Sequence, residues 1–298
     1  MASSCSMASM CCRQRVLQLD GIEELLPDDD SDYVGLAFHL YGIYAISVDG
    51  TYKRVSQSCW FRTVSAASDG ANSIFAFHQK SVYSLSYYAL DCSEPEVLRD
   101  SNLDVRVAIR MPADEDKLYL IHHEGMSTLN YSTGTITEME SDVWSWAGIL
   151  TAAYNPGDPS NAYVFHKTGL YKVNLFEATY ERVGELKWTV AAAAVYSRRL
   201  EAILLFFGRG YTAGCCVVNL DGTVSKTYTK FKHLDQAVAA VETRNPDQVF
   251  VIYRCGLFLV NVNDGVHFKL SKEPWHYMSA FTPLGEHGFI SCKLVPEP

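Results

Sequence analysis

The chain has 298 residues and a formal charge of −9 at pH 7. Hydrophobic residues make up 48% and charged residues 20%, which is the balance of a globular protein with ample core material. The acidic balance excludes a global electrostatic footprint for nucleic acid, so no nucleic-acid partner is expected. No window approaches the roughly 18 apolar residues needed to cross a bilayer, so no membrane insertion is expected either.

The nine cysteines include two adjacent pairs and no C-x-x-C spacing. An odd number in this pattern predicts reduced thiols rather than a disulfide framework or a zinc site. The first twelve residues, MASSCSMASMCC, lack the basic and apolar regions of a secretory signal. We therefore expect a cytoplasmic or nuclear protein.

In chain order, residues 4–10 and 13–18 are the first expected strands, and residues 22–32 would form an atypical acidic inner strand. A hairpin pattern follows. It begins with an apolar residue, which is usually followed by a His, and continues with a short turn and a strand of alternating apolar and polar residues. Alternation with period 2 indicates strands rather than helices. The five copies are FHLYGIYAIS (38–47), FHQKSVYSLS (77–86), IHHEGMSTLN (121–130), FHKTGLYKVN (165–174) and IYRCGLFLVN (252–261).

A polar strand comes after the hairpin, as in TYKRVSQ (51–57) and TYERVGE (179–185), and then a Trp or Leu opens a strand of small residues. Strands of this last kind are expected innermost, where neighbouring blades converge. The opening position recurs every 41 to 46 residues, at Leu19, Trp60, Leu103, Trp146, Trp188, Leu234 and Trp275. Four short strands in a unit of this length are typical of a β-propeller blade.

The pattern predicts one all-β domain over residues 1–298, a single β-propeller of seven four-stranded blades. The C-terminus supplies only a first strand (275–284) and a second strand (287–295), so the N-terminal strands would join and close the last blade. Six blades are the alternative if residues before Ser31 form no strands. The predicted units are 19–58, 59–101, 102–143, 144–186, 187–232, 233–273, and 274–298 together with 4–18.

The period and the four-strand order resemble those of the WD-type and Kelch-type propellers over nearly the whole chain. The recurring Gly-His, Trp-Asp and Gly-Gly motifs of those families are missing. The resemblance therefore implies the propeller fold and carries over no binding residues, since so widely used a fold implies little about function.

Two sets of residues recur at equivalent positions and are candidates for either a site or the scaffold. A ring of imidazoles could bind a metal or an anion, but equivalent residues of successive blades lie too far apart for one metal ion, so no metal site or cofactor is predicted. Tryptophans on a rim could anchor a partner, although recurrence favours a plug between blades. Structural roles are predicted for His39, His78, His122, His166, Trp146, Trp188 and Trp275.

Departures from the repeat are the better candidates for function. The fifth unit replaces the His turn with a longer Gly-rich loop, FFGRGYTAGCCVVN (206–219), and a mildly basic sector is expected beside it. Such a sector suits an acidic peptide or a phosphate group. The residues predicted to contact a partner are Arg209, Arg254, Lys232, Trp60 and Arg62.

No nucleophile, helical metal-binding or paired-carboxylate motif is recognisable in the chain, and no catalytic residue is predicted. The function favoured by the sequence is a non-enzymatic scaffold or adaptor that binds a protein or peptide within an intracellular complex. A multivalent carbohydrate-binding lectin is the alternative, and an enzyme with a site in the central channel is the third. The sequence does not determine the oligomeric state.

Overall fold

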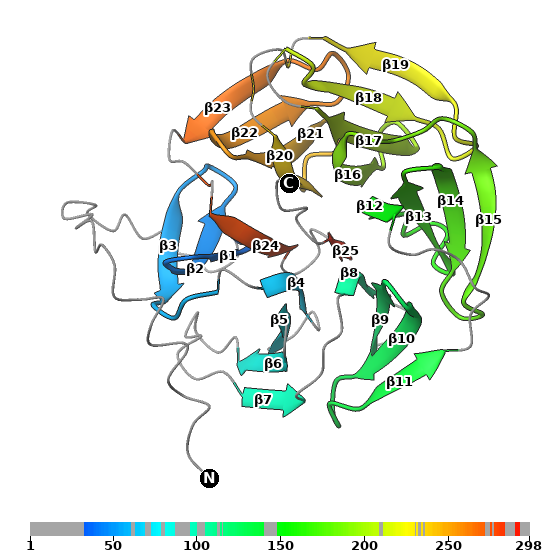
Figure 1. Ribbon diagram of the computed structural model, residues 1–298. Helices are drawn as coiled ribbons and strands as arrows, with labels where there is room; N and C mark the ends of the chain where they lie inside the picture. Colours follow the sequence, from blue (N-terminus) through cyan, green and yellow to red (C-terminus); the bar gives the residue numbers. More distant parts are fainter. Residues whose placement is uncertain are drawn as a thin grey trace.

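The computed structural model is an all-β protein whose sheets are arranged around a common centre, as in a β-propeller (Figure 1). No helix among the residues described is long and apolar enough to cross a membrane. The structure describes residues 33–60, 63–68, 73–78, 81–86, 96–99, 105–111, 114, 116–139, 148–208, 211–229, 231, 234, 236–271, 275, 277–283 and 290–292.

Three sheets are formed by the N-terminal half of the chain. Two of them each include one strand from the C-terminal end, β24 or β25. One sheet has the order β24-β1-β2-β3, with β24 (Met278–Pro283), β1 (Tyr33–His39), β2 (Gly42–Ser47) and β3 (Tyr52–Ser56). The next holds β4 (Thr63–Ser68), β5 (Ser73–His78), β6 (Ser81–Ser86) and β7 (Glu96–Arg99). The third has the order β11-β10-β9-β8-β25, with β8 (Val105–Arg110), β9 (Lys117–His122), β10 (Gly125–Asn130), β11 (Ile136–Met139) and β25 (Ile290–Cys292).

The other three sheets are each built from four consecutive antiparallel strands. They contain β12 (Ile149–Tyr154), β13 (Asn161–His166), β14 (Gly169–Asn174) and β15 (Thr179–Gly184); then β16 (Ala191–Ser197), β17 (Ala202–Phe207), β18 (Gly214–Val218) and β19 (Val224–Tyr228). The last contains β20 (Ala237–Glu242), β21 (Gln248–Tyr253), β22 (Gly256–Asn261) and β23 (His267–Ser271).

The prediction of seven four-stranded blades is wrong, because the described residues form five four-stranded sheets and one of five strands. The strand expected to open a seventh blade, β24, instead pairs antiparallel with β1, from Gly35 opposite Pro283 to His39 opposite Met278. The strand expected to follow it, around residues 287–295, includes β25, which pairs with β8. The closing N-terminal strands predicted at residues 4–10 and 13–18 lie outside the described residues, as does the inner strand predicted at 22–32.

An irregularity of the innermost strands identifies β24 as the inner strand of the first sheet. In each sheet the register between the inner strand and the second strand shifts by one residue opposite the last residues of the second strand. This shift is the pattern of a β-bulge. In the sheet of β16 to β19, for example, Ala191 lies opposite Phe207 while Ala193 lies opposite Phe206. The same shift occurs between β24 and β1, where His39 lies opposite Met278 and Phe38 opposite Ala280. The inner strands are thus β4, β8, β12, β16, β20 and β24.

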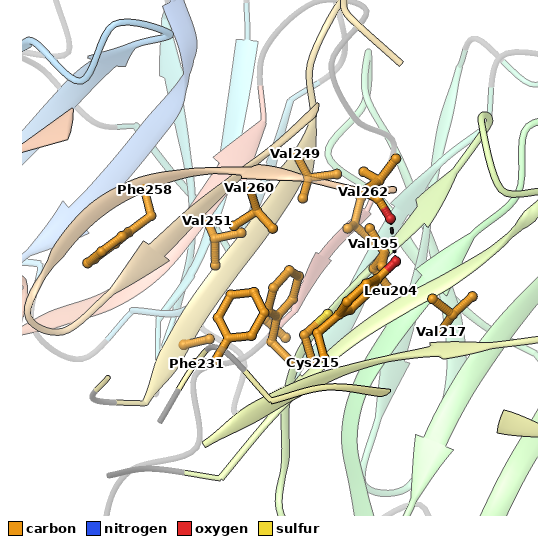
Figure 2. Close-up of a cluster of buried hydrophobic side chains, with 14 of the residues drawn as sticks. Val195, Leu204, Cys215, Val217, Phe231, Val249, Val251, Phe258, Val260 and Val262 are labelled. Carbon is orange, nitrogen blue, oxygen red and sulfur yellow. Dashed lines mark hydrogen bonds between the residues drawn. The ribbon is translucent and has the colours of Figure 1, made fainter. Parts of the chain in front are cut away.

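The apolar second strands are shared between two interfaces because successive side chains point to opposite faces of a sheet. In β17 (AILLFF), Ile203 and Leu205 pack toward the sheet of β12 to β15, and Leu204 and Phe206 pack toward the sheet of β20 to β23. Figure 2 shows the second of these cores, in which Leu204 and Val217 face Val249 and Val251 across the interface. A strand buried on both faces accordingly reads as a continuous apolar run.

Among the described residues, six buried apolar clusters of this kind each join two neighbouring sheets. The cluster between the sheet of β20 to β23 and the sheet of β24 and β1 to β3 includes Phe250 and Ile252 on one side and Ala37 and Ile46 on the other. Each sheet therefore packs against two neighbours.

The turns between the third and fourth strands form a second set of contacts between sheets. Gly222, with φ of +83°, lies in the turn after β18, and a Cβ built on it would meet Gly184 Cα of the preceding sheet at 2.5 Å. The Asp221 carboxylate holds this turn by accepting hydrogen bonds from the Thr223 backbone N–H (2.9 Å) and hydroxyl (2.6 Å). Positive φ and close approach of two backbones both require glycine here.

Replacing Gly222 with alanine is expected to destabilise the fold by about 1–3 kcal/mol, because the left-handed backbone is strained and the new methyl group meets the neighbouring backbone. Urea unfolding of the purified chain measures the effect. Gly157→Ala is the matched control, since its φ is not positive and its Cβ would approach only Asn155 Oδ1, at 3.2 Å. An equal loss in the two variants would contradict the proposed contact between sheets.

Candidate partner-binding face

The hairpins that join second and third strands end one face of the propeller, because equivalent turns of successive blades lie on the same side. Four of them have a two-residue turn between a final His and the first residue of the next strand, as in His39 opposite Gly42 and His166 opposite Gly169. Where the structure describes it, the crossover from the outer strand to the next inner strand lies beside a hairpin. A backbone hydrogen bond joins the two where Trp60 N donates to His39 O (3.2 Å).

Three of the four histidines are almost fully buried and bond within their own hairpins: His39, His122 and His166 are 7%, 4% and 5% exposed. His39 Nδ1 accepts from Tyr41 N (3.2 Å), and His166 Nδ1 accepts from Thr168 N (3.1 Å). His122 Nε2 lies 2.9 Å from Ser127 Oγ. The structural role of these histidines stays a prediction that the contacts support. Within the described ranges, no three His, Cys, Asp or Glu side chains gather as a metal ion would need.

The tryptophans of the crossovers lie in the cores between sheets. Trp60, Trp188 and Trp275 are 4%, 9% and 3% exposed. Trp60 meets the Phe38 ring edge-to-face at 5.6 Å, and Trp188 meets Phe165 at 5.2 Å. The structure thus places the Trp60 ring in the interior, where a partner does not reach it. Trp146 lies outside the described residues.

Of the basic residues predicted to contact a partner, the structure describes Arg254 alone; Arg62, Arg209 and Lys232 fall outside the described residues. Arg254 lies in the turn between β21 and β22 and is partly exposed. Its N–H donates to Gln236 O (3.2 Å) and its carbonyl accepts from Trp275 N (2.9 Å). The first bond joins Arg254 to the residue before β20, and the second joins it to the crossover that leads into β24.

Two exposed tyrosines at this crossover were not singled out by the sequence analysis. Tyr41, in the first hairpin turn, is 46% exposed, and Tyr277, just before β24, is 50% exposed. Their rings meet edge-to-face at 6.1 Å, and Leu40 N donates to Tyr277 O (3.2 Å). We refer to Tyr41, Tyr277 and Arg254, whose carbonyl accepts from Trp275 N two residues before Tyr277, as the Tyr41–Tyr277 surface. The available signal was a departure from the repeat, because Glu124 and Thr168 occupy the turn position of Tyr41 in other units.

The two tyrosines rest on a buried aromatic layer. The His39 ring lies 5.3 Å from Tyr41 and 6.1 Å from Tyr277, and it also contacts Tyr44 (5.7 Å) and Trp275 (6.2 Å). The Tyr41 ring is tilted against His39, and the other three contacts are edge-to-face, an arrangement that is favourable beyond the area it buries. Below them, the Ser279 hydroxyl has two possible carbonyl acceptors, Trp60 O at 2.8 Å and Phe38 O at 3.2 Å. The exposed rings are therefore held by packed neighbours.

The fifth hairpin, between β17 and β18, carries the long loop that the sequence analysis favoured. Tyr211 is 80% exposed there, and Gly208 N donates to Val190 O (3.0 Å) of the adjoining crossover. Its two cysteines offer no reactive thiol, because burial raises the pKa of Cys215 and raises that of Cys216 to about 12. A high thiol pKa disfavours the nucleophilic thiolate.

The geometry defines the class of protein as a β-propeller, and comparison with solved structures agrees. A chain in the crystal structure of a nidogen/laminin complex superposes with a TM-score of 0.59 at 8% identity, covering 87% of this chain and 97% of that one. A chain of the COPII outer coat vertex on membranes gives 0.57 at 9% identity, covering 93% and 80%. A catalytically inactive virginiamycin B lyase from Staphylococcus aureus, with quinupristin, gives 0.55 at 7% identity, covering 91% and 98%. No family model and no curated protein matches the chain.

His39 should make stability depend on pH. Burial lowers the pKa of His39 from its ordinary 6.5 to about 4. The unfolded chain thus binds more protons between these values, and the contribution of neutral His39 is complete above pH 6.5 and lost as pH falls toward 4. The free energy of unfolding should fall by about 1 kcal/mol per pH unit across this window through His39.

Denaturant unfolding of the wild type and of His39→Gln at pH 7.5 and pH 5 measures this contribution as the difference between their pH dependences. His123→Gln is the control, because His123 is the first residue of the turn after His122 and its side chain is 43% exposed. Equal pH dependence in the wild type and His39→Gln would exclude the buried imidazole as the cause.

Proposed function

We propose that the chain is a non-enzymatic β-propeller that binds a protein or an extended peptide through the Tyr41–Tyr277 surface. The observation that carries the proposal is the pair of half-exposed tyrosines on a buried aromatic layer. Exposed Tyr is enriched at the energetic centres of protein interfaces, where it gives a large contact area with a polar tip.

Rigidity strengthens this proposal. The Tyr41 turn is fixed by the His39 ring and by the backbone bond to Tyr277, so binding would order few new side-chain rotamers. Ordering side chains at an interface typically opposes binding by about 0.5–1.5 kcal/mol for each flexible side chain. A surface that is already packed from below avoids much of this penalty.

Arg254 would supply the charge at this surface. An arginine beside aromatic rings can form paired hydrogen bonds with a carboxylate or phosphate group of a partner. The overall charge of −9 makes such a local cation more selective, because an acidic partner is repelled elsewhere on the protein. We therefore favour a partner with an acidic group next to an apolar one.

Two of the structural neighbours support a role in an assembly, since one is a chain of a nidogen/laminin complex and the other a chain of a COPII outer coat vertex. At 8% and 9% identity the likeness extends to the fold alone. The lectin alternative needs similar sites in several blades. The residue at the position of Tyr41 changes from unit to unit, as Glu124 and Thr168 show, and this favours a single contact surface.

The double variant Tyr41→Ala/Tyr277→Ala should lose specific partners captured from a lysate and bind an isolated partner at least tenfold more weakly, a change of about 1.4 kcal/mol. Capture with mass spectrometry, followed by calorimetry with the purified partner, provides the measurement. Phe176→Ala/Phe268→Ala is the matched control, since both phenylalanines are exposed (49% and 62%) on other parts of the molecule.

The outcome that would refute this surface is retention of every specific partner by the tyrosine variant while its thermal unfolding matches that of the control. Binding to several glycans on an array, unaffected by the tyrosine changes, would instead support the lectin.

Arg254→Glu tests the charge of the partner separately from the aromatic contact. For an acidic partner we expect weaker binding that becomes less dependent on salt, because a screened attraction has been replaced by repulsion. Arg254→Gln, which removes charge without reversing it, should lie between the wild type and Arg254→Glu. Unchanged affinity in both variants would remove Arg254 from the surface and leave the tyrosines untested by this experiment alone.

A further inference from the structure

Strand β25 makes the sheet of β8 to β11 different from the other sheets, because it pairs with the inner edge of β8. The pairing is antiparallel, with Ile290 opposite Ile109, Ser291 opposite Ala108 and Cys292 opposite Val107. Figure 1 shows β25 near the centre of the propeller, and its backbone approaches the inner strands β4, β12 and β24 as well as β8.

β25 is an addition to a blade that is already complete. The strands β8, β9, β10 and β11 have the same order as the four strands of each other sheet. They pair continuously without β25, from Val105 opposite His122 to Leu129 opposite Ile136. The sheet therefore does not need a fifth strand to reach the architecture of its neighbours.

The repeat explains why a strand is left over. In each other unit, the strand that follows an inner strand pairs with it as the second strand of the blade, as β17 pairs with β16. After β24 this place is already taken by β1, all seven residues of which are buried. β25 therefore has no second-strand position of its own and pairs instead with an inner edge.

We infer that the inner edge of β8 is a binding site for an extended peptide, and that β25 occupies it as an intramolecular ligand. Recognition would come from strand pairing, in which the unpaired N–H and C=O groups of a sheet edge bond to those of an added strand. The site is distinct from the Tyr41–Tyr277 surface and does not depend on it.

The extent of pairing indicates that the occupant can be exchanged. Within the part of the chain that the structure describes, β25 pairs with β8 through three residues, whereas β9 and β10 in the same sheet pair through six. Fewer ladder bonds make local opening easier, and local opening is the step that would free the edge. A peptide of matching register in another molecule would then compete with β25 for β8.

The test uses the full chain and a fluorescent peptide with the sequence of residues 287–295, in which serine replaces Cys292 to prevent oxidation. In the variant Ile290→Pro/Ser291→Pro, one proline must remove a bond to β8, because successive N–H groups of a strand point to opposite edges. This variant should bind the peptide at least tenfold more tightly than the wild type, as measured by fluorescence anisotropy.

The control variant Ile290→Ala/Ser291→Ala keeps both N–H groups and should bind the peptide as weakly as the wild type. A peptide carrying the two prolines should not bind either protein. If the proline variant unfolds at the wild-type temperature and still gains no affinity for the peptide, the inference is wrong.

Hydrogen exchange of the wild type keeps the inference testable if the proline variant does not fold. Excess peptide should speed amide exchange in Ile290–Cys292 while exchange in β8 stays slow, since one strand replaces another. The serine substitution distinguishes the added peptide from β25 by mass. Unchanged exchange in Ile290–Cys292 at saturating peptide would overturn the inference.

Discussion

Apolar packing between adjacent sheets is the interaction on which the rest of this structure depends. Each sheet on its own has two apolar faces, and neither can be covered except by a neighbour. Ile203 and Leu204 are adjacent in sequence, yet they belong to different cores, one on each side of their sheet. Each sheet is therefore stabilised by its neighbours. The hairpin turns on one face of the propeller are held in place by the packed strands below them. The Tyr41–Tyr277 surface is rigid because it lies on these packed strands.

The propeller class could be predicted from sequence because the pattern of apolar and polar residues that produces the four-stranded sheet recurs in each unit. The AILLFF and QVFVIY segments are apolar on both faces, GLYKVN alternates, and TYERVG is polar. The polarity of each strand therefore indicates its position in the sheet, from the centre of the propeller to its outer rim. The number of sheets could not be predicted, because the pattern of β24 is that of an inner strand whichever second strand it joins. Pairing of β24 with β1 is decided by packing between segments at opposite ends of the described chain, and no local residue pattern encodes that choice.

The candidate surface was predicted less well than the fold. Recurrence directed attention to the hairpin and crossover residues, whose contact with a partner stays a prediction, and the Arg254 carbonyl accepts a hydrogen bond from Trp275 N, two residues before Tyr277. The sequence could not show that Trp60 is buried while Tyr277, two residues beyond the equivalent Trp275, is half exposed. That difference depends on which ring fills the space between two sheets, and thus on the three-dimensional arrangement. Tyr41 was detectable as an aromatic residue at a turn position where other units carry Glu124, Thr168 or Cys255.

The shared sheet of β24 and β1 also has a consequence for the order in which the protein folds. Five of the inner strands begin units whose next three strands follow at once in the chain, so those sheets can form from local segments as the chain is synthesised. β1, β2 and β3 are made before the other described strands but lack the inner strand of their sheet until β24 has been made. Ser279 and Phe38, which are hydrogen-bonded in the folded protein, lie 241 residues apart. Contacts of such long separation form slowly, so the apolar edge of β1 is the part of the nascent chain with the longest need of protection from other chains.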